Sequence, residues 1–292
     1  MTTARPRRSA LYMPAASARV LDKARGLPAD VLLFDLEDAV APAEKERARA
    51  QLIDALAAGG YAPRETVIRV NSLATPWGAD DLAAAAGARA DAVLLPKVEG
   101  AEQMDAAAWA LDAAGASIDL ALWAMIETPM GVLKAAEIAA HPRLACLVLG
   151  TNDLLADLQA APSADRAPLL PALAQTVLAA RAHGKAVLDG VYNAFRDEAG
   201  LAVECAQGRA LGMDGKTLIH PLQLAAANRA FAPSAEAVAE AHAQVEAFEA
   251  AVARGEGVGV VDGKIIENLH AAAAKRLIAQ AEGIAALEAA VS

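Results

Sequence analysis

The stretch LALWAMIETPMGVLKAAEIAAHPRLACLVLGTND, residues 120–153, decides the fold of this chain. It contains two apolar runs, and each run ends in a carboxylate, Glu127 after the first and Asp153 after the second. An alanine-rich segment separates the runs, so the unit is predicted to be strand–helix–strand with two parallel neighbouring strands. In such a unit both carboxylates emerge at the same end of the sheet.

The same alternation of apolar runs and alanine-rich segments extends from residue 9 to about residue 230. Continuous apolar character indicates strands that are buried on both faces, as in a parallel sheet. An α/β fold with eight such strands predicts a (β/α)₈ TIM barrel. An open doubly wound sheet is the alternative, but MPAAS closes the first strand where that fold usually carries a glycine-rich turn. The eight expected strands are residues 9–14, 30–38, 66–71, 92–99, 120–128, 144–153, 185–192 and 216–221.

The pattern changes after Pro221, where helical segments replace the strand–helix alternation. A short hairpin is expected around Asp262 and Gly263, because Asp-Gly is a strong two-residue turn signal. We therefore predict a catalytic barrel domain over residues 1–231 and a C-terminal helical extension over residues 232–292. The extension is expected to cover its own barrel mouth or the active site of a neighbouring subunit.

Composition narrows the functional class. The 292 residues carry a formal net charge of −10 and only 3% aromatic side chains, which argues against nucleic-acid binding. Cys146 and Cys205 are expected to be buried free thiols. SALYMP (9–14) is too short for a signal peptide and no 18-residue apolar run exists, so no membrane span is predicted and a cytoplasmic location is expected.

Acidic and basic side chains follow the expected strands at the end where barrel enzymes bind their substrates. Glu127 and Asp153 are the best pair of metal ligands, because Mg²⁺ takes one or two protein carboxylates and fills its octahedron with water and substrate oxygens. Helix capping is the alternative role for both residues. Arg69, near the end of a third strand, is expected to hold a substrate carboxylate or to form a structural ion pair.

The segment Asp35-Leu36-Glu37-Asp38 places three acids within four residues. Unpaired acids at this spacing repel one another, so some are expected to meet Arg69, Lys97 or metal-bound water. Lys97 is expected to pair with an acid or to stabilise a developing enolate, and a Schiff base is its alternative role. His220 is either an acid–base group or a residue that orders its loop.

Eight short strings, in order along the chain, resemble the β-subunit of citrate lyase and the related proteins of the aldolase/citrate lyase (HpcH/HpaI) superfamily. The resemblance implies a TIM barrel and cleavage of 3-hydroxyacyl-CoA thioesters of the citryl, malyl or citramalyl type into acetyl-CoA and a 2-keto acid. It also implies Mg²⁺, or Mn²⁺ in its place, with CoA as part of the substrate, and often a homotrimer. The strings are RRSALYMPA (7–15), FDLEDAVAPAEK (34–45), VIRVN (67–71), LLPKVE (94–99), IETPMG (126–131), LGTNDL (149–154), DGVYNAF (189–195) and GMDGKTLIHPLQ (212–223).

The resemblance assigns roles residue by residue. Glu127 and Asp153 look like the metal ligands, and Arg69 looks like the contact to the keto-acid oxygens. Asp35, Glu37 and Asp38 match an acidic motif that orders Arg69 and the waters of the metal. Substrate and CoA contacts are implied for Arg7, Arg8, Lys97 and Lys216.

One position departs from the family pattern. Related CoA lyases carry a DGK-like turn followed by an aspartate that acts as acid or base from the neighbouring subunit. Glu267 stands where that aspartate is expected, in VDGKIIEN (261–268). The added methylene either preserves proton transfer or displaces the carboxylate by more than about 1 Å, which is costly for catalysis.

The sequence therefore predicts a Mg²⁺-dependent carbon–carbon lyase, reversible by aldol condensation, whose partner is a small acyl-CoA. A CoA-independent class II keto-acid aldolase is the closest alternative enzyme. A citrate lyase β-subunit, a non-catalytic protein that binds CoA or an acyl carrier, and a thioesterase are further alternatives.

Overall fold

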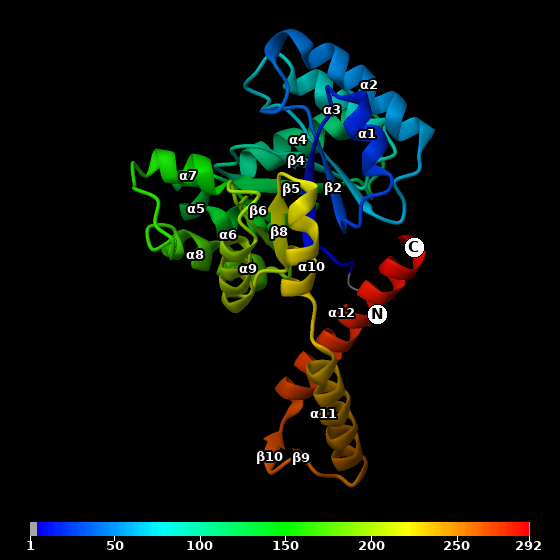
Figure 1. The fold of residues 1–292 in the computed structure, drawn as a ribbon, viewed down its shortest axis with the longest axis vertical. Helices are drawn as coiled ribbons and strands as arrows, with labels where there is room; N and C mark the ends of the chain where they lie inside the picture. The colour runs from blue at the N-terminus through cyan, green and yellow to red at the C-terminus, as the bar shows by residue number, and fades with distance from the viewer. Residues whose placement is uncertain (1–4, 292) are drawn as a thin grey trace. The chain divides into compact units, whose positions relative to one another are not determined.

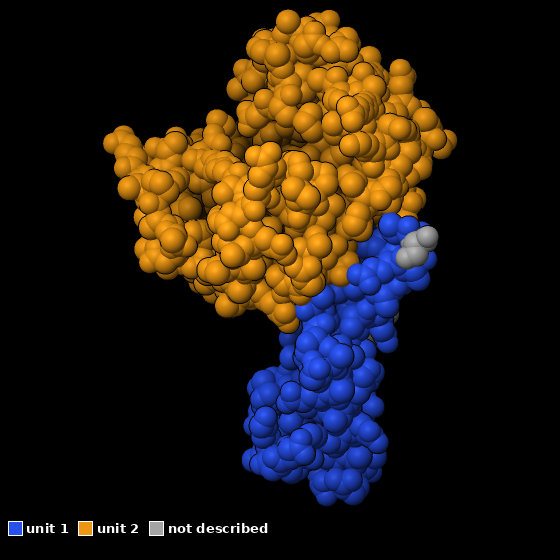
Figure 2. Space-filling model, in the orientation of Figure 1, with its two compact units in different colours: residues 1–6, 232–292 blue, residues 7–231 orange. Residues whose placement is uncertain are grey.

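The computed structural model describes residues 5–291 and divides into two compact units. One unit spans residues 7–231, and the other combines the residues up to 6 with residues 232–292 (Figure 2). None of the described helices is long and apolar enough to cross a membrane.

The first unit is built on a closed barrel of eight parallel strands, in which each strand pairs with its neighbour in the sequence and β8 pairs with β1 (Figure 1). The predicted (β/α)₈ TIM barrel is confirmed. The strands are β1 Ser9–Pro14, β2 Val31–Asp35, β3 Glu65–Arg69, β4 Ala92–Leu95, β5 Ala121–Ile126, β6 Leu144–Leu149, β7 Ala186–Asp189 and β8 Gly215–Leu218.

Helices surround the strands (Figure 1). They are α1 Ala18–Ala24, α2 Lys45–Ala58, α3 Gly78–Ala86, α4 Ala101–Ala113, α5 Pro129–Leu133, α6 Ala135–Ala139, α7 Thr151–Asp157, α8 Leu170–Ala182, α9 Glu198–Leu211 and α10 Leu224–Phe231. Two short 3₁₀ turns, Pro42–Glu44 and Pro221–Gln223, precede α2 and α10.

Strand alternation divides the buried side chains into two layers. Val31 and Leu33 of β2 belong to a cluster with Trp123, inside the barrel. Leu32 and Phe34 belong instead to the larger cluster between the strands and the helices. Because side chains alternate along a strand, Asp35 follows Leu33 on the inner face.

Strand register places two of the predicted site residues side by side. Asp35 and Arg69 are paired positions at the ends of β2 and β3. The strands are shorter than the apolar runs that predicted them, since β5 ends at Ile126 and β6 at Leu149. Glu127 consequently lies just beyond its strand, and Asp153 lies in the first turn of α7.

The second unit contains two long helices, α11 Ala235–Ala253 and α12 Asn268–Val291, with a small antiparallel hairpin between them (Figure 1). The hairpin strands are β9 Gly259–Val261 and β10 Lys264–Ile266. Asp262 and Gly263 connect them with φ of 49° and 76°. Positive φ at both central residues is what a type I′ hairpin turn requires, which explains the Asp-Gly pair.

Candidate active site

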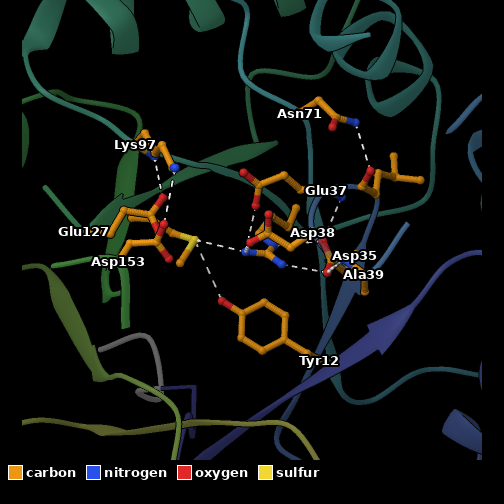
Figure 3. A network of polar contacts seen from close by, with 12 residues as sticks. Tyr12, Asp35, Glu37, Asp38, Ala39, Asn71, Lys97, Glu127 and Asp153 are labelled. Carbon is orange, nitrogen blue, oxygen red and sulfur yellow. Dashed lines mark hydrogen bonds and ion pairs between the residues drawn. The ribbon is translucent and has the colours of Figure 1, made fainter. Parts of the chain in front are cut away.

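Arg69 is held at the mouth of the barrel by Asp35. Its Nε and Nη2 donate to Oδ1 and Oδ2 of Asp35 at 2.8 and 2.7 Å. Asp35 also accepts the backbone N–H groups of Glu37 and Ala39, at 2.8 and 3.1 Å (Figure 3). Both members of the ion pair are buried, and charge-assisted two-point contacts of this kind fix orientation strongly. The guanidinium therefore has one defined position.

Two buried side chains form hydrogen bonds to the backbone of the acidic turn that follows β2. Lys45 Nζ donates to the carbonyl oxygens of Leu36 and Glu37 at 2.9 and 2.7 Å. Asn71 Nδ2 donates to the same carbonyl of Leu36 at 2.9 Å. These donors satisfy the backbone carbonyl groups of the turn, so the side chains of the turn do not have to do so and are directed to Arg69.

Glu37 and Asp38 lie on the remaining side of Arg69. Oε2 of Glu37 and Oδ2 of Asp38 are 2.8 and 3.3 Å from Nη1 of Arg69. Oε2 of Glu37 is buried, and although it forms an ion pair with Arg69, no described residue donates a hydrogen bond to it. Burial raises the pKa of Glu37 to about 7, although the charge of Arg69 opposes this shift. A carboxyl group that titrates near neutral pH is suited to general acid–base catalysis.

Glu127 and Asp153 meet at Lys97, which follows β4. Glu127 Oε1 accepts the backbone N–H of Lys97 at 2.7 Å, and Asp153 Oδ1 lies 3.3 Å from Lys97 Nζ (Figure 3). Burial raises the pKa of Glu127 to about 7, and the Asp153 charge adds to this while the Lys97 N–H counteracts it. Glu127 thus contacts the backbone of Lys97 and Asp153 contacts its ammonium, and the two carboxylates are close enough to affect each other.

Two backbone features shape this corner of the site. Lys97 has a φ of 50°, an uncommon conformation for a residue with a side chain and one that recurs at functional sites. Gly150 packs so closely on Glu127 that an added Cβ would lie 2.3 Å from the Glu127 Cβ. A side chain at position 150 would therefore displace the carboxylate.

The donor set fits a hard divalent cation. Glu127 keeps Oε2 free of protein donors in the described contacts. The Lys97 ammonium lies 3.3 Å from Asp153, and its charge also acts on Glu127. Among residues 5–291 no cluster of three or more His, Cys, Asp or Glu side chains is arranged to hold a metal ion, so the candidate site has only these two protein carboxylates. Two carboxylates suit Mg²⁺, which completes its shell with water and substrate oxygens.

The site contains a pocket of about 370 Å³ whose lining residues all belong to the barrel unit. Asp35, Asp38, Arg69, Glu127 and Asp153 all line it, so the structure brings these predicted site residues together. The lining also includes Tyr12, Pro14, Ala39, Met125, Leu149, Gly150, Thr151, Asn152, Val191, Asn193, Thr217 and Ile219.

Asn152 and Asn193 are two lining residues that the sequence pattern does not distinguish as site residues. Their side-chain amides bond reciprocally, at 3.2 and 2.8 Å, between the first turn of α7 and the loop that follows β7. Their signal was available, since Asn152 directly precedes the proposed ligand Asp153 and Asn193 lies just beyond the seventh strand.

Arg7 and Arg8 lie at the opposite end of the strands, before β1. Arg7 donates twice to Glu65, the first residue of β3, at 2.7 and 2.8 Å, and its guanidinium stacks on Trp123 at 5.1 Å. Arg8 is buried and bonds to Asp30 at 2.8 and 2.9 Å. Neither arginine lines the pocket, because both lie at the N-terminal end of the barrel strands and the pocket lies at the C-terminal end.

Lys216 is also absent from the pocket lining. It is fully buried and contacts Asp189, at 3.2 Å, and Glu204 of α9. Its neighbour Thr217 lines the pocket, so alternation along β8 turns Lys216 toward the helices. Its ammonium is neutralised there.

Glu267 and His220 lie elsewhere. Glu267 belongs to the second unit, is exposed, and precedes α12, where its backbone N–H donates to His270 Nδ1 at 3.0 Å. Its catalytic role, a homotrimer and the covering of a neighbouring site by residues 232–292 stay predictions. His220 Nδ1 accepts the backbone N–H of Leu222 at 3.2 Å and caps a 3₁₀ turn, which gives it a structural role.

Comparison with known proteins places these observations in a family. Residues 8–221 match the HpcH/HpaI aldolase/citrate lyase family model. A (3S)-malyl-CoA thioesterase of Cereibacter sphaeroides is 52% identical over 286 residues, which cover 98% of each chain. An L-malyl-CoA/beta-methylmalyl-CoA lyase of Cereibacter sphaeroides is 35% identical over 308 positions, covering 97% of each chain.

A solved structure shows the same architecture with ligands. The protein CitE of Mycobacterium tuberculosis, in complex with magnesium, acetoacetate and coenzyme A, is similar with a TM-score of 0.75 and 31% identity. The match covers 96% of this chain and 99% of that one. That relative thus binds magnesium and coenzyme A within the same fold.

Proposed function

The chain belongs to the HpcH/HpaI aldolase/citrate lyase family, and we propose that it is a Mg²⁺-dependent enzyme that acts on a 3-hydroxyacyl-CoA thioester of the malyl-CoA type. One observation carries the proposal: the Glu127–Asp153 pair and the Arg69 guanidinium line a single pocket. That arrangement suits a substrate with an α-hydroxycarboxylate, because a metal site and a fixed cation together match its charge and its two kinds of oxygen.

Each residue has a task in this proposal. Glu127 and Asp153 hold the metal, which when bound supplies Lewis acidity toward the oxygens of the substrate. Arg69, fixed by Asp35, faces the carboxylate of the substrate. Glu37 accepts or returns a proton, since its pKa of about 7 matches that task near neutral pH.

We propose that the enzyme hydrolyses the thioester, so that the carbon–sulfur bond of the substrate breaks. The 52% identical relatives are (3S)-malyl-CoA thioesterases, and the match extends over 98% of this chain. In hydrolysis, water adds to the thioester carbonyl carbon, the carbon–sulfur bond breaks, and the products are malate and the CoA thiol. Glu37 is the proposed base for that water.

Carbon–carbon cleavage is the second candidate, favoured by the lyase that is 35% identical over 97% of this chain. Here the substrate hydroxyl loses its proton to a base and the bond between the hydroxylated carbon and its CH₂ neighbour breaks. The products are glyoxylate and the enolate of acetyl-CoA, which must then gain a proton. Glu267, in place of the expected aspartate, is the proposed donor of that proton.

One experiment separates these reactions. The purified protein is incubated with (3S)-malyl-CoA in Mg²⁺ or in EDTA, and free thiol, malate, glyoxylate and acetyl-CoA are all quantified. Equal amounts of thiol and malate, formed only with Mg²⁺, identify the hydrolase, and glyoxylate with acetyl-CoA identifies the lyase. Intact thioester under both conditions refutes the proposal and favours a CoA-independent aldolase or a non-catalytic binding protein.

A further inference from the structure

The pocket contains a side chain to which the proposed chemistry gives no task. Tyr12 of β1 lines the pocket beside Arg69 and Glu127. Its ring packs against the Arg69 guanidinium, with the Arg69 Cζ 4.8 Å from the ring centroid. This contact fixes the ring, and Figure 3 shows the Tyr12 hydroxyl directed into the polar network.

The Tyr12 hydroxyl lacks a strong acceptor in the protein. Its hydrogen bond runs to the Met125 sulfur at 3.9 Å, and a thioether is a weak acceptor. The other two tyrosines differ, because Tyr61 donates to the Leu21 carbonyl at 3.1 Å and Tyr192 donates to Asp197 at 2.6 Å. Tyr12 is thus the tyrosine whose hydroxyl stays available to a ligand.

A second donor points to the same place. Nη1 of Arg69 lies 3.8 Å from the Met125 sulfur. The Arg69 guanidinium and the Tyr12 hydroxyl, which come from two different strands, therefore contact the same sulfur atom. The Nε and Nη2 groups of Arg69 are both engaged with Asp35. The remaining group, Nη1, already faces Glu37 and Asp38 at 2.8 and 3.3 Å. Arg69 can therefore offer a substrate at most this one shared group, and a carboxylate with two oxygens needs another donor beside it.

We propose that the Tyr12 hydroxyl donates a hydrogen bond to a carboxylate oxygen of the substrate, and so completes with Arg69 Nη1 the site that binds this carboxylate. Burial raises the pKa of Tyr12, although the charge of Arg69 opposes this shift. The hydroxyl consequently keeps its proton and acts as a donor. The inference rests on the proposed function, because it assumes a substrate that carries a carboxylate into this pocket.

The test is Tyr12→Phe, which removes the hydroxyl and keeps the ring on Arg69. Binding of (S)-malate in the presence of Mg²⁺ is measured by calorimetry, without turnover. Loss of a hydrogen bond to a charged group is expected to weaken malate binding about tenfold or more. Because the hydroxyl has only a sulfur partner, the melting temperature is expected to stay at the wild-type value.

Tyr61→Phe is the matched control, since it removes a buried hydroxyl that bonds to Leu21. It is expected to lower the melting temperature and to leave malate affinity unchanged. Wild-type affinity in Tyr12→Phe, or a lower melting temperature with no change in affinity, overturns the inference alone. If the wild-type protein turns over no (3S)-malyl-CoA and binds no malate with Mg²⁺, the proposed function fails and this inference fails with it.

Discussion

Asp35 is the residue on which the geometry of the mouth depends, and Asp35→Asn tests that dependence. Four donors converge on its two oxygens, two from Arg69 and two from the backbone of Glu37 and Ala39. Asparagine keeps one oxygen and replaces the other with an NH₂ group, so part of this set of donors loses its acceptor. The buried Arg69 charge also loses its two-point partner.

The expected loss of stability is large. Breaking a buried ion pair by removing one charge costs about 3–5 kcal/mol, and a whole protein is stabilised by only about 5–15 kcal/mol. The free energy of unfolding, measured by urea denaturation, should therefore fall by about 3–5 kcal/mol in Asp35→Asn. For a unit of this size, that corresponds to a melting temperature lower by roughly 6–20 °C.

Asp80→Asn provides the matched control, because it makes the same chemical change in an exposed ion pair. Asp80 lies 3.3 Å from Arg49, and its side chain is 69% exposed. Such surface pairs contribute about 0–1 kcal/mol, and Arg49 keeps its second partner, Asp81, at 2.7 Å. If the two variants lose similar stability, the reasoning that the Asp35–Arg69 pair organises the mouth is refuted.

Two further predictions concern the carboxylates. Glu127→Gln should weaken Mn²⁺ binding at least about tenfold, measured by electron paramagnetic resonance, because a charged ligand is lost. The control Glu102→Gln changes an exposed residue in the first turn of α4 and should leave Mn²⁺ affinity unchanged. Equal affinities in the two variants would show that Glu127 is not a ligand. In EDTA, the melting temperature should fall as the pH rises from about 5 to 8. The pKa of Glu37 is raised from 4.5 to about 7 in the folded protein. Over this pH range the folded state therefore keeps a proton that the unfolded chain has lost, and the free energy of unfolding decreases. Glu37→Gln should make this slope shallower, and an unchanged slope contradicts the raised pKa.

The sequence allowed the barrel and much of its mouth to be predicted. Apolar runs that end in polar residues identify parallel strands, and a closed barrel brings their carboxyl ends together. Glu127, Asp153 and Arg69 were predicted at one site for that reason. An ion pair between Arg69 and an acid of the segment 35–38 was also expected from the sequence. That Asp35 is its two-point partner follows from the register between β2 and β3, which a single sequence does not specify.

Other placements depend on partners that are distant in sequence. Lys216, for which the resemblance implies a CoA contact, is neutralised by Asp189 of β7, 27 positions away, and by Glu204 of α9. Tyr12 lies in an apolar run that indicates only a buried strand. Its availability as a hydrogen-bond donor becomes visible only when its acceptor in the fold is known to be the sulfur of Met125, on β5. Periodicity predicts which face a residue occupies, whereas the identity of its contacts depends on tertiary packing.

The turnover of (3S)-malyl-CoA tests the central claim most directly, with wild-type protein and Glu127→Gln compared in Mg²⁺ and in EDTA. The account predicts release of CoA thiol and malate by the wild-type protein with Mg²⁺, and loss of that release in EDTA or in Glu127→Gln. Release that is equal in all four samples would contradict a metal-dependent site at Glu127 and Asp153.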